Sequence, residues 1–214
     1  MGSETVAIRI HHGSFYSDSS AAVQHETLPA SKMAPLNVII VGGGIAGTIC
    51  ARVLRVHHNV TVVERSPQER TWGNGISIRP NASRILEELG FSKERAGTVV
   101  LEKFRSMDIH GRLRGEYNMI PYENATDGPF YAQQWADLWK ELRRLAFAPS
   151  EELGIQGKPA TLLSGVKVVA ADVEKGEVTL ADGRKLVGDL IVGTFQDGKT
   201  LPPPPATYIP TFPP

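Results

Sequence analysis

The feature that most constrains the fold is a short apolar run followed at once by closely spaced glycines. Residues 36–41 are rich in β-branched side chains, which is typical of a buried parallel strand. Gly42, Gly44 and Gly47 follow in the spacing G-x-G-x-x-G. The first glycine permits a tight turn, the second leaves room for a pyrophosphate beside the backbone, and the third allows the next helix to pack closely. The order predicts a strand, a turn and a helix over residues 45–56, with the helix N-terminus directed at phosphate groups.

An acidic residue ends the second strand of the same unit. Residues 60–63 have the pattern of a second strand, and Glu64 follows Gly42 by 22 residues. An acid at this offset, about 20 residues, accepts hydrogen bonds from a ribose and repels a 2′-phosphate. The alternative is a flexible turn followed by a solvated acid. Because strand, helix, strand and acid occur in the required order, we favour a dinucleotide site whose first nucleotide is not NADP.

The rest of the chain mixes helices and strands. Residues 71–82 are predicted to form a glycine-rich loop that leads into a helix near Pro80. This helix has Ile85, Leu86 and Leu89 on one face and stops at Gly90. The other predicted elements are a hairpin (101–109 and 113–117), a helix (135–146), a β-meander (166–170, 177–180, 185–187) and a buried strand (189–193). We therefore predict an α/β fold, in which a nucleotide-binding parallel sheet with helices carries an inserted hairpin and meander.

Composition excludes some classes of function. The chain has 23 basic and 23 acidic residues and no basic cluster, so no nucleic-acid partner is expected. Cys50 is the single cysteine, which excludes an internal disulfide and favours a reducing compartment such as the cytoplasm. We expect no membrane span, because no apolar stretch is long enough, and no motif of metal ligands or of a nucleophile is found.

The two ends differ from the middle of the chain. Residues 1–33 show little periodicity and are predicted to be a disordered extension. Residues 34–193 are predicted to form the nucleotide-binding domain. Residues 194–214 contain a run of prolines that enters neither a helix nor a central strand, so we expect a disordered tail.

Several motifs together resemble the N-terminal part of the FAD-dependent aromatic hydroxylases, the group of salicylate hydroxylase and p-hydroxybenzoate hydroxylase. The resemblance covers residues 37–193. The segments that carry it are Val41-Gly42-Gly43-Gly44-Ile45-Ala46-Gly47, Val63-Glu64-Arg65, Gly73-Asn74-Gly75-Ile76, Pro80-Asn81-Ala82, and residues 137–146, 178–183 and 189–193.

The resemblance implies a Rossmann-like FAD-binding fold with FAD in an extended form, and a partial insertion of the substrate domain within residues 34–193. In the family, NAD(P)H reduces the flavin and oxygen then hydroxylates a small aromatic substrate, so that the cofactor supplies the chemistry. No catalytic side chain is assigned. The cofactor-binding residues that it implies are Gly42, Gly44, Ile45, Ala46 and Gly47 at the pyrophosphate, Glu64 at the ribose, Arg65 beside it, and Gly75 and Ile76 on the flavin side.

The chain departs from the family pattern in three places. Trp135 stands where the family has an arginine that reaches the phosphates, and Arg65 is either a partial replacement or a solvated residue. The last strand continues with Thr194 where the family has Ala-Asp-Gly. The second half of the family fold is not found, so we expect a fold that is incomplete at its C-terminus and a truncated protein whose activity stays open.

Two other functions remain open from the sequence. The chain could be a non-catalytic FAD-binding module or accessory subunit, or a flavin-scaffold isomerase or cyclase. An incomplete sheet also exposes unpaired edges and apolar surface, from which we expect self-association.

Overall fold

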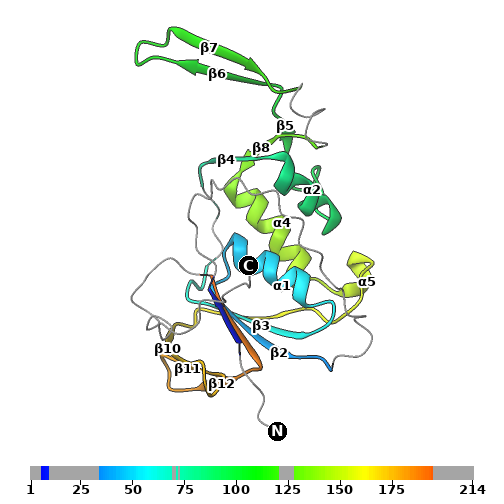
Figure 1. The fold of residues 1–214 in the computed structure, drawn as a ribbon, viewed down its shortest axis with the longest axis vertical. Helices are drawn as coiled ribbons and strands as arrows, with labels where there is room; N and C mark the ends of the chain where they lie inside the picture. Colours follow the sequence, from blue (N-terminus) through cyan, green and yellow to red (C-terminus); the bar gives the residue numbers. More distant parts are fainter. Residues whose placement is uncertain (1–5, 10–33, 69–70, 72, 121–127, 195–214) are drawn as a thin grey trace, which may run out of the picture.

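A five-stranded parallel sheet forms the centre of the molecule (Figure 1). The structure, a computed structural model, describes residues 6–9, 34–68, 71, 73–120 and 128–194. Each neighbouring pair of strands in the central sheet is parallel. In spatial order the strands are β1 (Val6–Arg9), β13 (Leu190–Gly193), β2 (Asn37–Val41), β3 (Asn59–Glu64) and β9 (Thr161–Ser164).

Two helices cover one face of this sheet. They are α1 (Ile45–Leu54) and α4 (Trp135–Phe147), which pack against each other. Alternate residues of β2, such as Val38 and Ile40, are buried beneath them. The two small residues Ala51 of α1 and Ala146 of α4 lie in the same cluster, fully buried, which allows the helices to approach closely.

A small antiparallel sheet covers the other face. It consists of β10 (Val168–Asp172), β11 (Glu177–Leu180) and β12 (Lys185–Val187). Its buried residues Val178 and Leu180 pack on Ile39 and Val41, the β2 residues that point away from the helices. Because β2 is buried on both faces, its residues 38–41 are all apolar, as predicted for a central parallel strand.

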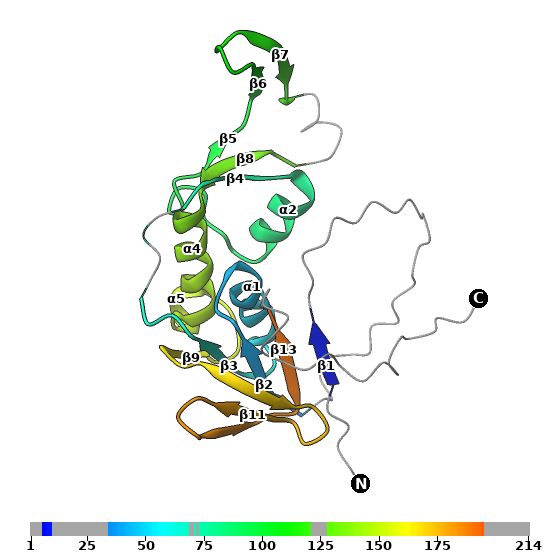
Figure 2. The same ribbon diagram turned by 90° about the vertical axis from the view of Figure 1, so that its left-hand side faces the viewer.

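A second layer lies beyond α4 (Figure 2). A three-stranded antiparallel sheet contains β4 (Gly75–Ile78), β8 (Tyr131–Gln134) and β5 (Val99–Val100), and α2 (Pro80–Glu88) lies next to it. The short α5 (Ser150–Leu153) lies at the other end of α4, near the central sheet. Leu138, Leu142 and Leu145 of α4 are buried in the core beneath this sheet, as their spacing predicts.

A hairpin extends away from these layers, at the top of Figure 1. It consists of β6 (Lys103–Met107) and β7 (Leu113–Asn118), which pair antiparallel as predicted. The turn is fixed by Asp108, whose Oδ1 accepts hydrogen bonds from the backbone N–H groups of His110 and Arg112, at 2.9 Å each. His110 is thus a turn residue, as expected.

Some elements differ from the sequence-based prediction. Residues 75–78 were expected in a loop, but they form β4, since they pair with β8. The pattern also did not reveal β1, β5, β8, β9 or α5, all of which have five residues or fewer. The expected apolar face of α2 is partly wrong: Leu86 is buried, whereas Ile85 is 54% exposed.

The predicted domain boundaries are only partly within the described residues. Within the range 1–33 that was expected to be disordered, residues 6–9 form β1 and pair with β13. The remainder of that range and residues 195–214 of the expected tail lie outside the described residues.

No helix in the described part of the chain is both long and apolar enough to cross a membrane.

Candidate functional site

The glycine turn connects β2 to α1 at the carboxyl end of the sheet. Gly42 has φ of +109°, a conformation that favours glycine, and its N–H donates to Val63 O at 2.8 Å. A Cβ on Gly47 would lie 1.9 Å from Gly42 O. The first and third glycines are therefore required by the turn and by the close approach of α1, as the motif predicts.

Gly44 lies at the open side of the turn. It is the N-cap of α1, and a Cβ built on it would meet no atom within 4 Å. Its backbone is extended, with φ of −74° and ψ of −168°, so the conformation does not itself require glycine. The side of the turn next to the α1 N-terminus is thus open to a ligand, and the N–H groups of the first turn favour an anion there.

Glu64 is bound directly to the glycine turn. Its Oε2 accepts a hydrogen bond from Gly43 N–H at 2.7 Å, and its Oε1 accepts one from Ser66 N–H at 2.8 Å. These bonds hold the carboxylate beside the turn with lone pairs left over. A ribose hydroxyl group could donate to them.

Helix α4 holds the same turn from the other side. Trp139 is buried, and its indole N–H donates to Gly43 O at 2.7 Å. Trp135 stacks on Trp139 with ring centroids 5.7 Å apart. The guanidinium of Arg143 lies over the Trp139 ring, 4.6 Å from its centroid. Gly43 is therefore fixed through its N–H by Glu64 and through its carbonyl by Trp139.

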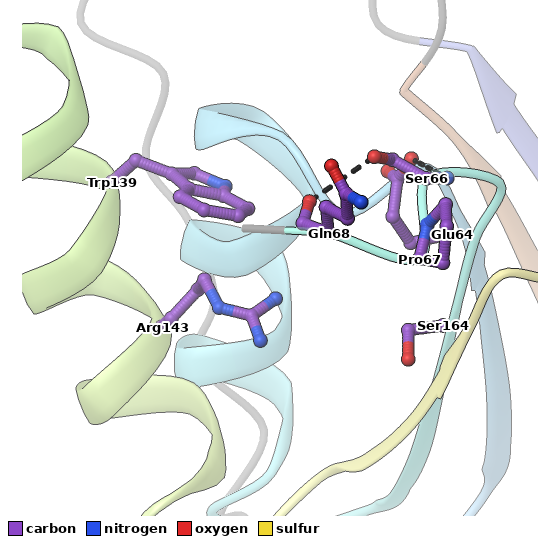
Figure 3. Close-up of a pocket in the computed structure, with 7 residues that line it drawn as sticks. All are labelled: Glu64, Ser66, Pro67, Gln68, Trp139, Arg143 and Ser164. Atoms are coloured by element: carbon purple, nitrogen blue, oxygen red, sulfur yellow. Dashed lines mark hydrogen bonds between the residues drawn. The ribbon is translucent and has the colours of Figure 1, made fainter. Parts of the chain in front are cut away.

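A cavity of about 210 Å³ lies between these two supports (Figure 3). Trp139 and Arg143 project into it from α4, and Glu64 lies across from them. The other lining residues are Ser66, Pro67 and Gln68, which follow β3, and Ser164 at the end of β9. The cavity is next to the turn, so a ligand held at the α1 N-terminus could extend into it.

Thr194 closes the turn from the side of β13. Its Oγ1 donates toward Val41 O at 3.1 Å and Gly42 O at 3.0 Å, and its N–H donates to Val41 O at 2.9 Å. The residue that departs from the family pattern is therefore part of the support of the turn.

Cys50 lies on α1 and packs against the core below the turn. Burial raises the pKa of its thiol above the usual value. The thiol therefore stays protonated near neutral pH, as expected for a packing residue.

The predicted site residues fall into two groups. Gly42, Gly44 and Gly47 belong to the turn that Glu64 holds through Gly43 N–H, and Ile45 and Ala46 lie in the first turn of α1. Arg65 is exposed and is not among the residues that line the cavity.

The second group, Gly75 and Ile76, belongs to a different sheet. Gly75 is exposed, whereas the half-buried side chain of Ile76 packs against the core between β4 and α4. Because the side chain of Ile76 packs in this core, the expected role of Ile76 beside the flavin stays a prediction.

Trp139, Arg143 and Ser164 were missed by the sequence reasoning. Residues 135, 139, 143 and 147 form a stripe of aromatic and cationic side chains at four-residue spacing, which could have indicated a second functional face of the helix.

The chain belongs to the FAD dependent oxidoreductase family, whose sequence model matches residues 37–187. It is 34% identical over 159 residues to hispidin-3-hydroxylase of Neonothopanus nambi, covering 74% of this chain and 37% of that protein. It is 28% identical over 153 residues to 3-hydroxybenzoate 6-hydroxylase of Polaromonas naphthalenivorans, covering 70% of this chain and 36% of that protein.

Among solved structures, the fold is similar to that of 2-methyl-3-hydroxypyridine-5-carboxylic acid oxygenase. The TM-score is 0.62 with 25% identity, and the match covers 78% of this chain and 41% of the other. The predicted Rossmann-like fold and the family resemblance are confirmed, and FAD as the cofactor is confirmed at the level of the family. The chain spans well under half the length of these relatives.

Proposed function

We propose that this chain binds FAD, with the pyrophosphate at the α1 N-terminus and the adenosine ribose at Glu64. The observation that carries the proposal is the position of the Glu64 carboxylate, 2.7 Å from Gly43 N and beside the open face of Gly44. The residues fit the cofactor, because an anion-binding turn and a ribose acceptor are adjacent. Gly42, Gly47 and Thr194 shape the turn.

The reaction proposed is hydroxylation of a small aromatic substrate with NAD(P)H and oxygen. It is supported by the similarity to hydroxylases whose names specify hydroxylated rings. Bound flavin would supply the redox chemistry. The residues of this chain would anchor and orient it: Glu64 by accepting from the ribose, the turn by donating backbone N–H groups, and Trp139 by fixing the Gly43 carbonyl.

Gel filtration of the purified chain after incubation with FAD tests the proposal. Near-stoichiometric flavin in the protein peak is expected, and FMN, which lacks the adenosine half, should be lost. Flavin that NAD(P)H reduces, with oxygen uptake on adding a phenol, would support the monooxygenase. Retained flavin without turnover would indicate a non-catalytic binding module. Turnover of a substrate without NAD(P)H or oxygen would indicate an isomerase or cyclase. No retained flavin would contradict the proposal.

Self-association is proposed from the exposed hairpin. Five large side chains on it are more than half exposed: Phe104, Met107, Ile109, Leu113 and Tyr117. A two-stranded ribbon of this kind is marginal alone and gains stability from a further layer or strand. Sedimentation velocity should show dimers or larger species that diminish in an Ile109→Ser, Leu113→Ser variant. A monodisperse monomer for the unsubstituted chain would contradict this.

A cytoplasmic location is proposed because the chain has a single cysteine, Cys50, which fits a reducing compartment. Cell fractionation would test it.

A further inference from the structure

One wall of the cavity is a ladder of flat side chains on a single face of α4. Trp135, Trp139, Arg143 and Phe147 are spaced four residues apart, so their side chains lie one above another along the helix. Trp135 stacks on Trp139, and the Arg143 guanidinium lies between the Trp139 ring, at 4.6 Å, and the Phe147 ring, at 5.5 Å. This face is distinct from the leucine face that packs in the core.

The two members of the ladder that line the cavity are held in place. The indole of Trp139 is 6% exposed and anchored by its N–H to Gly43 O. Arg143 is held by two aromatic rings, which restricts the orientation of its guanidinium plane. Both groups reach the cavity as preoriented surfaces, so a ligand would lose little free energy in ordering them.

The opposite wall is polar and carries the acid. Glu64 stands across the cavity from Arg143, with Ser66 and Gln68 beside it and Ser164 at the end of β9 (Figure 3). A ligand that fits between these walls has hydroxyl groups for Glu64 and a flat, electron-rich ring for the guanidinium and indole. A purine nucleoside has both features.

We propose that Trp139 and Arg143 bind the adenine ring of the cofactor and make this site selective for a purine nucleotide. The inference rests on the proposed FAD site, and it adds specificity-determining residues on α4 that neither the glycine motif nor Glu64 supplies. The ring contacts the exposed edge of the Arg143 and Trp139 surfaces while the ribose donates to Glu64.

Calorimetric titration of the full chain with ADP and with UDP tests this. The two ligands share ribose and diphosphate and differ only in the base, so the ratio of their dissociation constants isolates base recognition. We expect ADP to bind at least about tenfold more tightly than UDP, since a cation–π contact between the purine ring and a desolvated guanidinium is of this order. Arg143→Met should remove most of this preference by weakening ADP alone.

Three further variants separate recognition from support of the fold. Lys140→Met removes a charge from an exposed position of the same helix and should leave the ratio unchanged. Arg143→Lys should fail to restore the preference, because an ammonium lacks the planar edge of N–H groups that a guanidinium presents. Trp139→Phe keeps an aromatic ring but loses the hydrogen bond to Gly43 O. It should therefore weaken the binding of both ADP and UDP, and it should reduce the ratio of their dissociation constants less than Arg143→Met does.

Equal affinity for ADP and UDP in the unsubstituted chain, or no binding of ADP, would overturn the inference. So would an unchanged ratio in Arg143→Met, or full rescue by lysine. FAD retention with equal ADP and UDP affinities would refute base recognition and leave the proposed function standing. A clear preference for ADP without FAD retention would support the inference and refute the proposed function.

Discussion

Gly47 and Gly44 serve the glycine turn in different ways, although both belong to one motif. At Gly47 the neighbouring carbonyl of Gly42 occupies the position of a Cβ, whereas at Gly44 that position faces open space. The motif spacing predicts these separate roles, and the surroundings of each glycine in the structure agree with that prediction. The structure assigns Gly47 to the fold and Gly44 to the ligand side.

Gly47→Ala is expected to destabilise the fold. The new Cβ would lie 1.9 Å from Gly42 O, so the backbone of the turn or of α1 must move. Overpacking of this kind costs about 1–3 kcal/mol or more. Urea unfolding would measure the loss, with Gly75→Ala as a control at an open position. A loss no greater than that of the control would contradict this view of the turn.

Arg55 is expected to be sensitive even to lysine. Its side chain is fully buried, and it donates to Lys158 O, Leu145 O and Ser150 Oγ at 3.0, 2.9 and 2.8 Å. Burial, and secondarily the charge of Arg52, lowers its pKa, but the guanidinium remains protonated at neutral pH. Lysine cannot make all three bonds in this geometry.

Arg55→Lys should therefore lower the free energy of unfolding by about 2–4 kcal/mol, as hydrogen bonds to charged groups are each of order 1.5–3 kcal/mol. Chemical denaturation measures it, and the exposed Arg112→Lys is the matched control. If the two variants have equal free energies of unfolding, the three buried hydrogen bonds of Arg55 do not stabilise the fold, which would contradict this prediction.

At the scale of elements, an exposed ion cluster joins the two strands of the hairpin. Glu116 on β7 accepts hydrogen bonds from Arg105 at 2.6 Å and Lys103 at 3.2 Å, both on β6. Hydrogen bonds from Arg105 and Lys103, with their charges, lower the pKa of Glu116 below its ordinary value of 4.5. Its stabilisation of the hairpin is therefore present above pH 4.5 and lost as the pH falls through the lowered pKa.

Hairpin amides should accordingly be less protected from hydrogen exchange at about pH 3 than at about pH 6. Glu116→Gln should reduce protection at the higher pH and remove most of the difference, whereas Glu102→Gln should change neither. An unaltered pH difference in Glu116→Gln would exclude this carboxylate as the cause. The effect should be small, since the pair is exposed to solvent.

Elements with a strong pattern were predicted from the sequence, and short ones were not. β2, α1 and β3 combine periodicity, glycines and an acid, and the structure places them within two residues of the prediction. β9 has four residues, and its place in the sheet depends on its distant partner β3. Local pattern does not contain that pairing, so the Ser164 side of the cavity could not be predicted.

At the scale of the molecule, the site follows from the topology of the parallel sheet. In the sheet, β2 pairs with β3, the next strand along the chain, on one side and with the distant strand β13 on the other. Ligands bind at the carboxyl ends of strands where the order diverges in this way. Gly42, Glu64 and Thr194 follow or end the three strands there, so residues distant in sequence meet at one turn. The helices on one face and the β10–β12 sheet on the other hold these strands in place (Figure 1).

The measurement that tests the central claim most directly is a titration of FAD into the unsubstituted chain and into Gly44→Ala, with thermal melts of both. An alanine fits the backbone and space at Gly44, so the ligand-free melting temperatures should agree closely. The added methyl group would lie on the open side of the turn, and FAD affinity should fall about tenfold or more, or about 1.4 kcal/mol. Unchanged FAD affinity, or no FAD binding by the unsubstituted chain, would contradict the account.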